Sequence, residues 1–232
     1  MNKNFENFII ENGDWLRKYV YMGVKALTFL DFKFKTNLQI KGREYVESLP
    51  ENGVVFVSNH ETYYLDVLLM CDLLWTSGDK SFFNIRDSIF FIAADETAKQ
   101  SPLLKFHRAS GTIPFKRQWK AGDELVNREA DYEGMQKIKA ALDEGWLINF
   151  PTGTTNPDAK MRDGTAKFLK KENPIVVPVK ITGSGEAYGK RGILSKGFRM
   201  PIIVEFFEPF KTENMTEEEI MQILSEKTGC KK

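Results

Sequence analysis

The chain contains 232 residues, 42% of them hydrophobic, and carries a formal net charge of +1 at pH 7. This length and composition can support a substantial core, so we expect one large α/β domain. The small net charge gives no general electrostatic reason to bind nucleic acid, and we expect no such partner. Cys71 and Cys230 form neither a metal-type pair nor a disulfide framework, so the sequence predicts a reducing, cytoplasmic setting and no metal site.

Residues 1–35 are predicted to form an amphipathic helical segment ahead of the main domain. Within residues 15–30, the cations Arg17, Lys18 and Lys25 are interspersed with apolar residues at helical spacing, namely Trp15, Leu16, Tyr19, Val20, Val24, Leu27 and Leu30. This pattern is typical of a helix that lies in a membrane interface, where the cations favour anionic lipid. It is equally typical of a helix that docks its apolar stripe on a domain. No stretch has the roughly 18 consecutive apolar residues of a spanning helix.

Residues 36–232 are predicted to form one domain built on a mixed, mostly buried β-sheet flanked by helices. Apolar runs predict strands at residues 54–58, 89–93, 112–115, 146–150, 175–181 and 202–207. Helical patterns predict helices at residues 62–75, ahead of His107, at about 123–144, and between Lys160 and Pro174.

Two further stretches bear on local structure. Thr216 and Glu219 have the spacing of a capping box, which predicts a final helix. The stretch Gly183-Ser184-Gly185 lacks the glycine spacing of a nucleotide-binding loop, so we expect it to be a plain connecting loop.

A histidine and a carboxylate follow the strand expected at residues 54–58. His60 and Asp66 are six residues apart, and side chains on one helix face meet at three or four, so His60 must precede the helix if the two are to meet. We therefore expect a helix that begins near Thr62 and turns Asp66 back toward the loop. An imidazole held by a carboxylate can take a proton from a hydroxyl near neutral pH, which makes His60 a candidate general base. A loop histidine bonded to backbone, with an acid placed for the helix dipole, is the structural alternative.

Two later stretches place cations beside glycine turns at the ends of predicted strands. Arginine's planar fork suits phosphate, and a glycine turn lets backbone and hydroxyl donors approach a ligand. Each stretch alone is better explained as a solvated surface turn. The candidate substrate-binding residues in these stretches are Gly111, Lys116, Arg117, Gly153, Thr154, Lys160 and Arg162.

Taken in order, these stretches resemble the motifs of the glycerolipid acyltransferase family, typified by 1-acylglycerol-3-phosphate acyltransferase. The family pattern is Asn-His-x4-Asp, then Gly-x-Ile-x-x-x-Arg, then Phe-Pro-Glu-Gly-Thr-Arg, then an apolar Val-Pro-Val strand. It is matched here by residues 59–66, 111–117, 150–155 and 177–179. The resemblance covers roughly residues 38–210, and four matches in order are far more specific than any one of them.

The resemblance implies that His60 is the general base and Asp66 the acid that orients it. It further implies that the acceptor site is lined by Gly111, Arg117, Gly153 and Thr154. Five residues separate His60 from Asp66, one more than in the family pattern.

The chain also departs from the family at two positions associated with the glycerol-phosphate head group. Thr152 stands where the family has Glu, and Thr155 stands where it has Arg. The cations that remain available for a phosphate are Lys116, Arg117, Lys160 and Arg162.

The resemblance implies an O-acyltransferase that moves a fatty acyl group to a lysolipid hydroxyl, most simply that of 1-acylglycerol-3-phosphate, in phospholipid biosynthesis. The acyl donor would be acyl-CoA or acyl-carrier protein, with no cofactor besides, and the protein would be peripheral at the cytoplasmic face of a membrane. Two alternatives use the same His60 and Asp66 pair: acylation of a phosphate-free lysolipid such as a lyso-amino-acid lipid, and hydrolysis of a lipid or thioester. A non-catalytic lipid-binding module would have no need of this pair.

Overall fold

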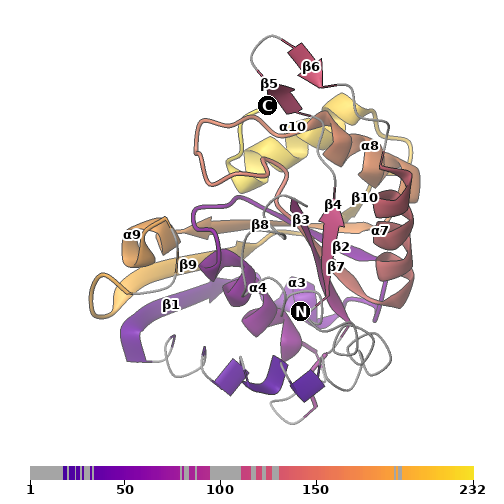
Figure 1. The fold of residues 1–232 in the computed structure, drawn as a ribbon. Coiled ribbons are helices and arrows are strands. Elements are labelled where there is room, and N and C mark those ends of the chain that lie inside the picture. Colours follow the sequence, from indigo (N-terminus) through magenta and orange to yellow (C-terminus); the bar gives the residue numbers. More distant parts are fainter. Residues whose placement is uncertain are drawn as a thin grey trace, which may run out of the picture.

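The computed structural model describes residues 18–19, 21–23, 25–26, 28, 32, 34–78, 80, 84–86, 88–94, 111–115, 119–121, 124–126, 131–190, 192 and 195–232. Within them, a single eight-stranded sheet carries helices on both faces (Figure 1). The strand order is β1-β9-β8-β2-β7-β3-β4, and β10 pairs with β8. This confirms the predicted α/β class, a mixed sheet flanked by helices.

The strands of this sheet are β1 (Thr36–Lys41), β2 (Val54–Ser58), β3 (Ile89–Ala94), β4 (Thr112–Phe115), β7 (Trp146–Asn149), β8 (Ile175–Thr182), β9 (Met200–Phe206) and β10 (Phe210–Lys211). The run β8-β2-β7-β3-β4 is parallel, whereas β9 is antiparallel to β8 and β1 is parallel to β9. A separate antiparallel pair is formed by β5 (Trp119–Ala121) and β6 (Glu124–Val126). Every residue of β2 is buried, as expected for a central parallel strand covered on both faces.

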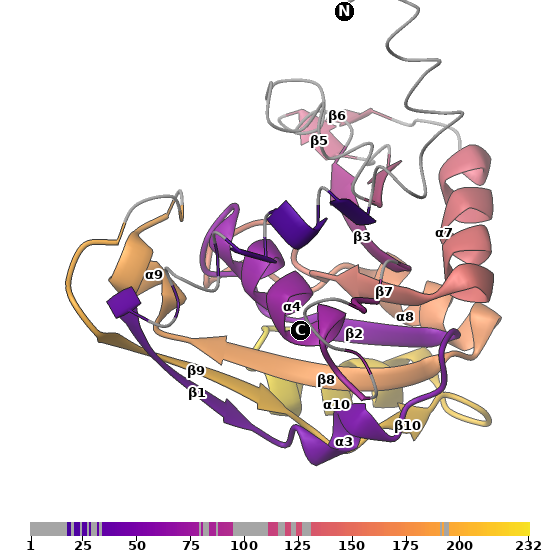
Figure 2. The ribbon, with the colours of Figure 1, turned by 90° about the horizontal axis from the view of Figure 1, so that it is seen from below.

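Helices pack on the two faces of the sheet in separate groups (Figures 1 and 2). One face carries α3 (Glu44–Glu47), α4 (Leu65–Trp75) and α9 (Ser184–Tyr188), and the other carries α7 (Tyr132–Glu144), α8 (Asp163–Glu172) and α10 (Glu217–Thr228). Because successive side chains of a strand point to opposite faces, β2 contributes to both cores. Val54 and Phe56 pack in the α4 core, and Val55 and Val57 pack in the core beneath α7, α8 and α10.

The described part of the N-terminal segment is helical and lies against α4, with the opposite chain direction. Tyr21 stacks on Trp75 near the end of α4 with a ring separation of 4.6 Å, and its hydroxyl donates to the carbonyl of Ile89 at 3.0 Å. Further along the segment, Lys25 contacts Asp72, which lies one turn closer to the start of α4. The segment therefore docks on the face of the domain that α4 covers.

A buried ion pair fixes this docking. Lys25 Nζ lies 3.0 Å from one carboxylate oxygen of Asp72, and the other oxygen accepts the Thr28 hydroxyl at 2.8 Å. Tyr21, Lys25, Thr28 and Phe32 are all buried and lie four, three and four residues apart, which defines one helical stripe. The expectation that Lys25 meets anionic lipid is therefore wrong, because its ammonium group is enclosed beside Asp72.

The apolar stripe predicted within residues 15–30 is a different one. Tyr19, its described member, is exposed. Its other members lie outside the described residues, together with Arg17; they are Trp15, Leu16, Val20, Val24, Leu27 and Leu30.

We expect Lys25→Met to lower the free energy of unfolding by about 3–5 kcal/mol, because it leaves the Asp72 carboxylate buried without its counter-charge. The double variant Lys25→Met with Asp72→Leu should regain most of that loss, since neither charge remains to be desolvated. Guanidinium denaturation of the single and double variants measures both effects. A single-variant loss below about 1 kcal/mol, the value of a solvent-exposed pair, would contradict the buried pairing.

Several predicted boundaries are wrong. The helix expected over about 123–144 begins only at Tyr132, after Asp131 accepts the Gly134 N–H as its N-cap at 3.0 Å. Glu124–Val126 pairs with β5 instead. The helix expected to begin near Thr62 begins at Leu65, because the backbone N–H groups of Glu61 and Thr62 turn toward the Asp66 carboxylate.

Other sequence predictions concern residues 183–185, the start of the last helix and the residues before His107. Ser184 lies in α9, so the expected plain loop at 183–185 is in part a short helix. Thr216 and Glu219 form both hydrogen bonds of the predicted capping box at the start of α10. The helix expected ahead of His107 lies outside the described residues. None of the helices in the described ranges is both long and apolar enough to span a membrane.

Candidate active site

The two predicted catalytic residues lie at one end of the sheet, where the parallel strands β2, β7 and β8 finish. His60 follows β2 by two residues, the 150–155 turn follows β7, and Ser184 follows β8 by two residues. Parallel strands bring the loops at their carboxyl ends together, which is where α/β sheets bind ligands. We call this end of the sheet, with the loops after β2, β7 and β8, the site end.

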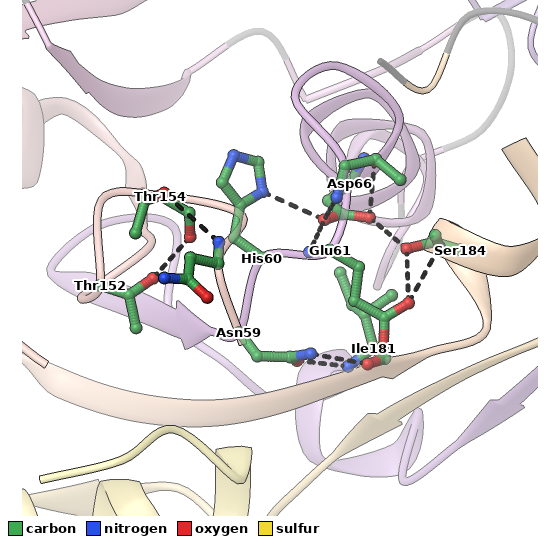
Figure 3. A network of polar contacts seen from close by, with 11 residues as sticks. Asn59, His60, Glu61, Asp66, Thr152, Thr154, Ile181 and Ser184 are labelled. Carbon is green, nitrogen blue, oxygen red and sulfur yellow. Dashed lines mark hydrogen bonds and ion pairs between the residues drawn. The ribbon is translucent and has the colours of Figure 1, made fainter. Parts of the chain in front are cut away.

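His60 and Asp66 are in direct contact across the loop that joins β2 to α4. Nδ1 of the imidazole lies 3.0 Å from Oδ2 of Asp66 (Figure 3). Because an ionised carboxylate can only accept, this contact holds a proton on Nδ1 and leaves Nε2 as the basic nitrogen. In Figure 3 that second ring nitrogen points away from Asp66. The His60 side chain keeps 12% of its surface exposed, whereas Asp66 is fully buried.

The Asp66 carboxylate is held by four further hydrogen bonds. Oδ2 accepts the backbone N–H groups of Glu61 at 2.6 Å and Thr62 at 2.8 Å. Oδ1 accepts the hydroxyls of Thr62 at 3.0 Å and Ser184 at 2.6 Å. Hydrogen bonds to a charged group are worth about 1.5–3 kcal/mol each, so this donor set fixes Asp66 as an oriented anion. The same turn accommodates the extra residue between His60 and Asp66.

Two contacts position His60, one at the residue before it and one at its ring. The amide of Asn59 bonds both backbone groups of Ile181, donating to its carbonyl and accepting its N–H, each at 2.7 Å. This pair extends the β2–β8 ladder past Ser58 to the residue before His60. The imidazole itself stacks on Phe150 with a ring separation of 4.3 Å. The backbone before His60 and one face of its ring are therefore held before any substrate binds.

Ser184 belongs to the site although the sequence interpretation placed it in a plain loop. It is fully buried, and its hydroxyl lies 2.6 Å from Asp66 Oδ1 and 3.1 Å from Glu61 Oε2 (Figure 3). The backbone N–H of Gly185 also donates to Glu61 Oε2, at 3.0 Å. The loop that carries His60 is thus fastened to the start of α9 through two carboxylates. Ser184 contacts Asp66 rather than the imidazole, so His60 cannot activate it as a nucleophile in this arrangement.

We expect Ser184→Ala to lower kcat by about tenfold, equivalent to ~1.4 kcal/mol, because the anion that orients His60 loses one charge-assisted donor. The acceptor KM should stay within about twofold, since Ser184 acts through Asp66. Ser77→Ala is the matched control, because Ser77 is a buried, hydrogen-bonded serine near the other end of α4. The positioning role would be refuted if Ser184→Ala and Ser77→Ala were both less stable than wild type and steady-state kinetics gave the same kcat for both.

The turn after β7 lies beside His60 and contains Gly153 and Thr154. The Gly153 N–H donates to the Phe150 carbonyl at 3.0 Å, and φ at Gly153 is +63°, a left-handed conformation that glycine adopts without strain. The Thr152 hydroxyl donates to the Thr154 carbonyl at 2.9 Å. The N–H of Gly153 is therefore engaged within the turn in this conformation.

The predicted cations separate into different groups. Arg162 is exposed and joins this turn, with Nε 3.4 Å from the Thr152 carbonyl. Lys160 is also exposed and forms an isolated backbone bridge with Lys231. Lys116 and Arg117 follow β4 but lie outside the described residues.

Gly111 lies away from the site end. It immediately precedes β4, next to Ile89 at the start of β3, and both strands run toward the site end. A Cβ there would come within 2.4 Å of the Ile89 carbonyl oxygen, and φ is +79°. The structure thus gives Gly111 a packing role, and its place in the acceptor site stays a prediction.

Among the described residues, the thiol nearest to Asp66 along the chain is that of Cys71, on the same helix. Burial, reinforced by the neighbouring charge of Asp72, raises the pKa of the Cys71 thiol to about 12. The group therefore stays protonated near neutral pH, and a protonated thiol is a poor nucleophile.

Comparison with known proteins identifies the class to which this fold and site belong. The chain is a member of the acyltransferase family, whose model, described as Acyltransferase, matches residues 37–182. This match spans β1 through β8 and therefore includes His60, Asp66 and the 150–155 turn. It confirms the family resemblance drawn from the ordered motifs.

A solved structure shares the fold over nearly the whole chain. It is the crystal structure of the 1-acyl-sn-glycerophosphate (LPA) acyltransferase PlsC from Thermotoga maritima, with a TM-score of 0.64 and 19% sequence identity. The alignment covers 97% of this chain and 85% of the Thermotoga protein. No curated protein sequence matches the chain.

Proposed function

We propose that this protein is an O-acyltransferase that moves a fatty acyl group from an acyl thioester to the hydroxyl of a lysolipid. The observation that carries the proposal is the His60–Asp66 contact at the site end, with Nε2 directed away from the carboxylate. Membership of the acyltransferase family supports the reaction class. The Thermotoga protein is a 1-acyl-sn-glycerophosphate acyltransferase, which supports a lysolipid as the class of acceptor.

In the proposed mechanism, His60 Nε2 takes the proton of the acceptor hydroxyl as its oxygen attacks the thioester carbonyl carbon. Asp66 stabilises the imidazolium that forms and keeps the ring in one orientation. The carbon–sulfur bond then breaks, and the imidazolium returns the proton to the departing thiolate. The thioester is itself the activated group, so this chemistry requires no metal or cofactor.

Two observations favour direct transfer over a covalent acyl-enzyme. The Ser184 hydroxyl bonds to the carboxylates of Asp66 and Glu61 rather than to the imidazole, so His60 is not placed to remove its proton. The Cys71 thiol is buried and protonated at neutral pH because its pKa is raised to about 12. A hydrolase that activates water with the same His60 and Asp66 is the alternative, and it differs in releasing free fatty acid.

We propose 1-acylglycerol-3-phosphate as the acceptor, with its phosphate bound chiefly by Arg117 and assisted by Arg162, Lys116 or Lys160. Arg162 supports the proposal because it is an exposed guanidinium attached to the turn beside His60. Thr152 and Thr155 supply no charge of their own, so these cations must take the part of the family's arginine. A phosphate-free lysolipid is the alternative acceptor.

Arg117→Ala and Arg162→Ala are each expected to raise the KM for lysophosphatidate by about tenfold, equivalent to ~1.4 kcal/mol of lost binding, and to spare the donor KM. Arg43→Ala, at an exposed arginine paired with Glu47, is the matched control. The same kinetics are measured in parallel with a phosphate-free lysolipid as the acceptor. If neither variant changed the lysophosphatidate KM, or if wild type preferred the phosphate-free acceptor, the phosphate acceptor would be rejected.

The proposed reaction is tested by identifying its product. Labelled acyl-CoA and labelled acyl-carrier protein are supplied separately, with a panel that includes lysophosphatidate and lyso-amino-acid lipids. Mass spectrometry should find the label in an acylated lipid, and the more effective carrier identifies the donor. Label found only in free acid would favour the hydrolase.

We also propose that the protein acts as a peripheral protein at the cytoplasmic face of a membrane, because an acylated lysolipid stays in the bilayer. The described N-terminal stripe that docks on α4 differs from the apolar stripe predicted within residues 15–30. This difference supports a second, lipid-facing role for the segment.

A further inference from the structure

Exposed aromatic and cationic side chains gather beside the active site, where the N-terminal segment meets the loop before β9. Phe198 is 78% exposed and Phe34 is 58% exposed. Lys35, Lys196 and Arg199 are exposed as well. We call these five residues the Phe198 patch.

Strand register places the Phe198 patch at the site end of the sheet. Thr36, which follows Lys35, pairs with Met200, which follows Arg199. Because β9 is antiparallel to β8, the beginning of β9 lies beside the end of β8, from which Ser184 follows. Figures 1 and 2 show α9 and the beginnings of β1 and β9 on the same side of the molecule. At about 4.8 Å per strand spacing, β9 and β1 lie roughly 10–15 Å from the strand that leads to His60.

The backbone holds Phe198 outward from both sides. The Lys196 N–H donates to the Ala187 carbonyl of α9, and the Arg199 N–H donates to the Lys35 carbonyl, each at 2.7 Å. Arg199 has φ of +55°, a left-handed conformation that is costly for a residue with a Cβ. The protein thus maintains a strained turn that displays a large apolar side chain to solvent. Strain of this kind is characteristic of functional surfaces.

The loop before β9 is also joined to the loop that carries His60. The Tyr63 N–H donates to the Lys190 carbonyl at 2.9 Å, and Lys190 Nζ lies 5.9 Å from the centre of the Tyr63 ring. Tyr63 is itself 45% exposed. The loop that carries His60 therefore also presents an aromatic and a cationic group.

We propose that the Phe198 patch is the surface by which the enzyme docks on an anionic bilayer, with His60 facing the lipid. Phe34 and Phe198 insert at the headgroup level, and Lys35, Lys196 and Arg199 bind anionic headgroups. The inference rests on the proposed function, since a lipid acceptor is what requires the site end to face a bilayer.

Its chemistry distinguishes this surface from one built for a protein partner. Aromatic side chains flanked by Lys and Arg are the composition of membrane-interfacial segments, in which apolar insertion and attraction to anionic lipid act together. The exposed carboxylate of Glu186 on α9 lies at the same end, but the three cations of the Phe198 patch outweigh it. Docking here would bring the acceptor hydroxyl to His60 without removing the lipid from the bilayer.

Vesicle flotation of the full chain tests the docking surface, using vesicles of phosphatidylcholine alone and of phosphatidylcholine mixed equally with phosphatidylglycerol. Phe198→Ser is expected to weaken binding to both vesicles by about fivefold, because it removes an inserting ring. The double variant Lys196→Gln with Arg199→Asn should weaken binding by about tenfold on the mixed vesicles alone. Asparagine is chosen at residue 199 because it tolerates the left-handed conformation.

Tyr132→Ser is the matched control, since Tyr132 is 75% exposed on α7, which packs at the β4 side of the sheet. It should bind both vesicles as wild type does. Wild-type binding by Phe198→Ser, or an equal loss in Tyr132→Ser, would overturn the proposal. If the variants of the Phe198 patch bound vesicles as wild type does but bound acyl-carrier protein more weakly, the proposal would be overturned in favour of a protein partner.

Acyl transfer to a detergent-dispersed lysolipid, measured on the same samples, separates this inference from the proposed function. It should be unchanged in all three variants, because none of these residues belongs to the catalytic network. If wild type transfers no acyl group and vesicle binding still depends on Phe198, the proposed function fails while the docking surface stands. If wild type transfers the acyl group normally and vesicle binding does not depend on Phe198, the docking surface fails while the proposed function stands.

Discussion

Replacing His60 with alanine is expected to lower kcat for acyl transfer by about 10²–10⁴-fold, the range typical of a lost general base. The loss should fall on kcat, because His60 Nε2 acts on the proton that moves as the hydroxyl attacks. Folding should be retained, since the imidazole is partly exposed and Asp66 keeps four other donors. Steady-state kinetics and a thermal melt on the same preparation measure the two effects.

His60→Gln is the conservative companion to this variant. Glutamine can still donate a hydrogen bond toward Asp66, yet it has no nitrogen that accepts a proton near neutral pH. Both variants should therefore be equally inactive. Near wild-type kcat in His60→Ala with an intact melt would show that the imidazole is not the base.

Asp66→Asn is expected to lower kcat by about 10²-fold or more, because the imidazolium loses its counter-charge during attack. An amide oxygen in the place of Oδ2 can still accept from His60, Glu61 and Thr62. The hydroxyls of Thr62 and Ser184 can rotate to accept from the new amide group. The geometry is thus largely conserved while the charge is lost.

Asp143→Asn controls for the loss of one negative charge, because Asp143 is exposed on α7. It should leave kcat unchanged. A kcat for Asp66→Asn within about threefold of wild type, with normal stability, would show that the Asp66 charge contributes little to the reaction.

The centre of the sheet was predictable because it is buried on both faces. The strands at residues 54–58, 146–150 and 175–181 are continuous apolar runs, and they became β2, β7 and β8. The first strand, β1, was not predicted, because its residues alternate between exposed and covered positions and it resembles ordinary surface sequence. The charged stretch near Glu124 favoured a helix, yet it pairs as β6 and the helix begins only after the Asp131 cap.

The candidate site combines contacts between residues close in the sequence with contacts between residues far apart in it. His60 and Asp66 are six residues apart, so a short loop argument was enough to bring them together. Ser184 lies 118 residues from Asp66, and it meets that carboxylate only because β8 is the neighbour of β2 in the sheet. Strand order was not available from the sequence, so no local signal identified Ser184.

Gly111 shows what a sequence motif leaves open. Its place in an ordered motif suggested a position in the acceptor site, but a motif does not say which end of a strand reaches the site. The parallel pairing of β3 and β4 puts Gly111 at the beginning of its strand, away from His60. A motif residue that precedes a parallel strand lies at the end opposite to one that follows such a strand.

One measurement tests most directly the central claim, that His60 drives direct acyl transfer to a lipid hydroxyl. Wild type and His60→Ala are incubated with labelled acyl thioester and lysophosphatidate, and acylated lipid, free fatty acid and labelled protein are quantified from the same quenched samples. We predict that wild type places the label in the lipid without labelled protein at any time, and that His60→Ala forms about 10²-fold less of the lipid or still lower amounts. Labelled protein that forms before the lipid, free acid as the main wild-type product, or equal lipid formation by both proteins would contradict the account.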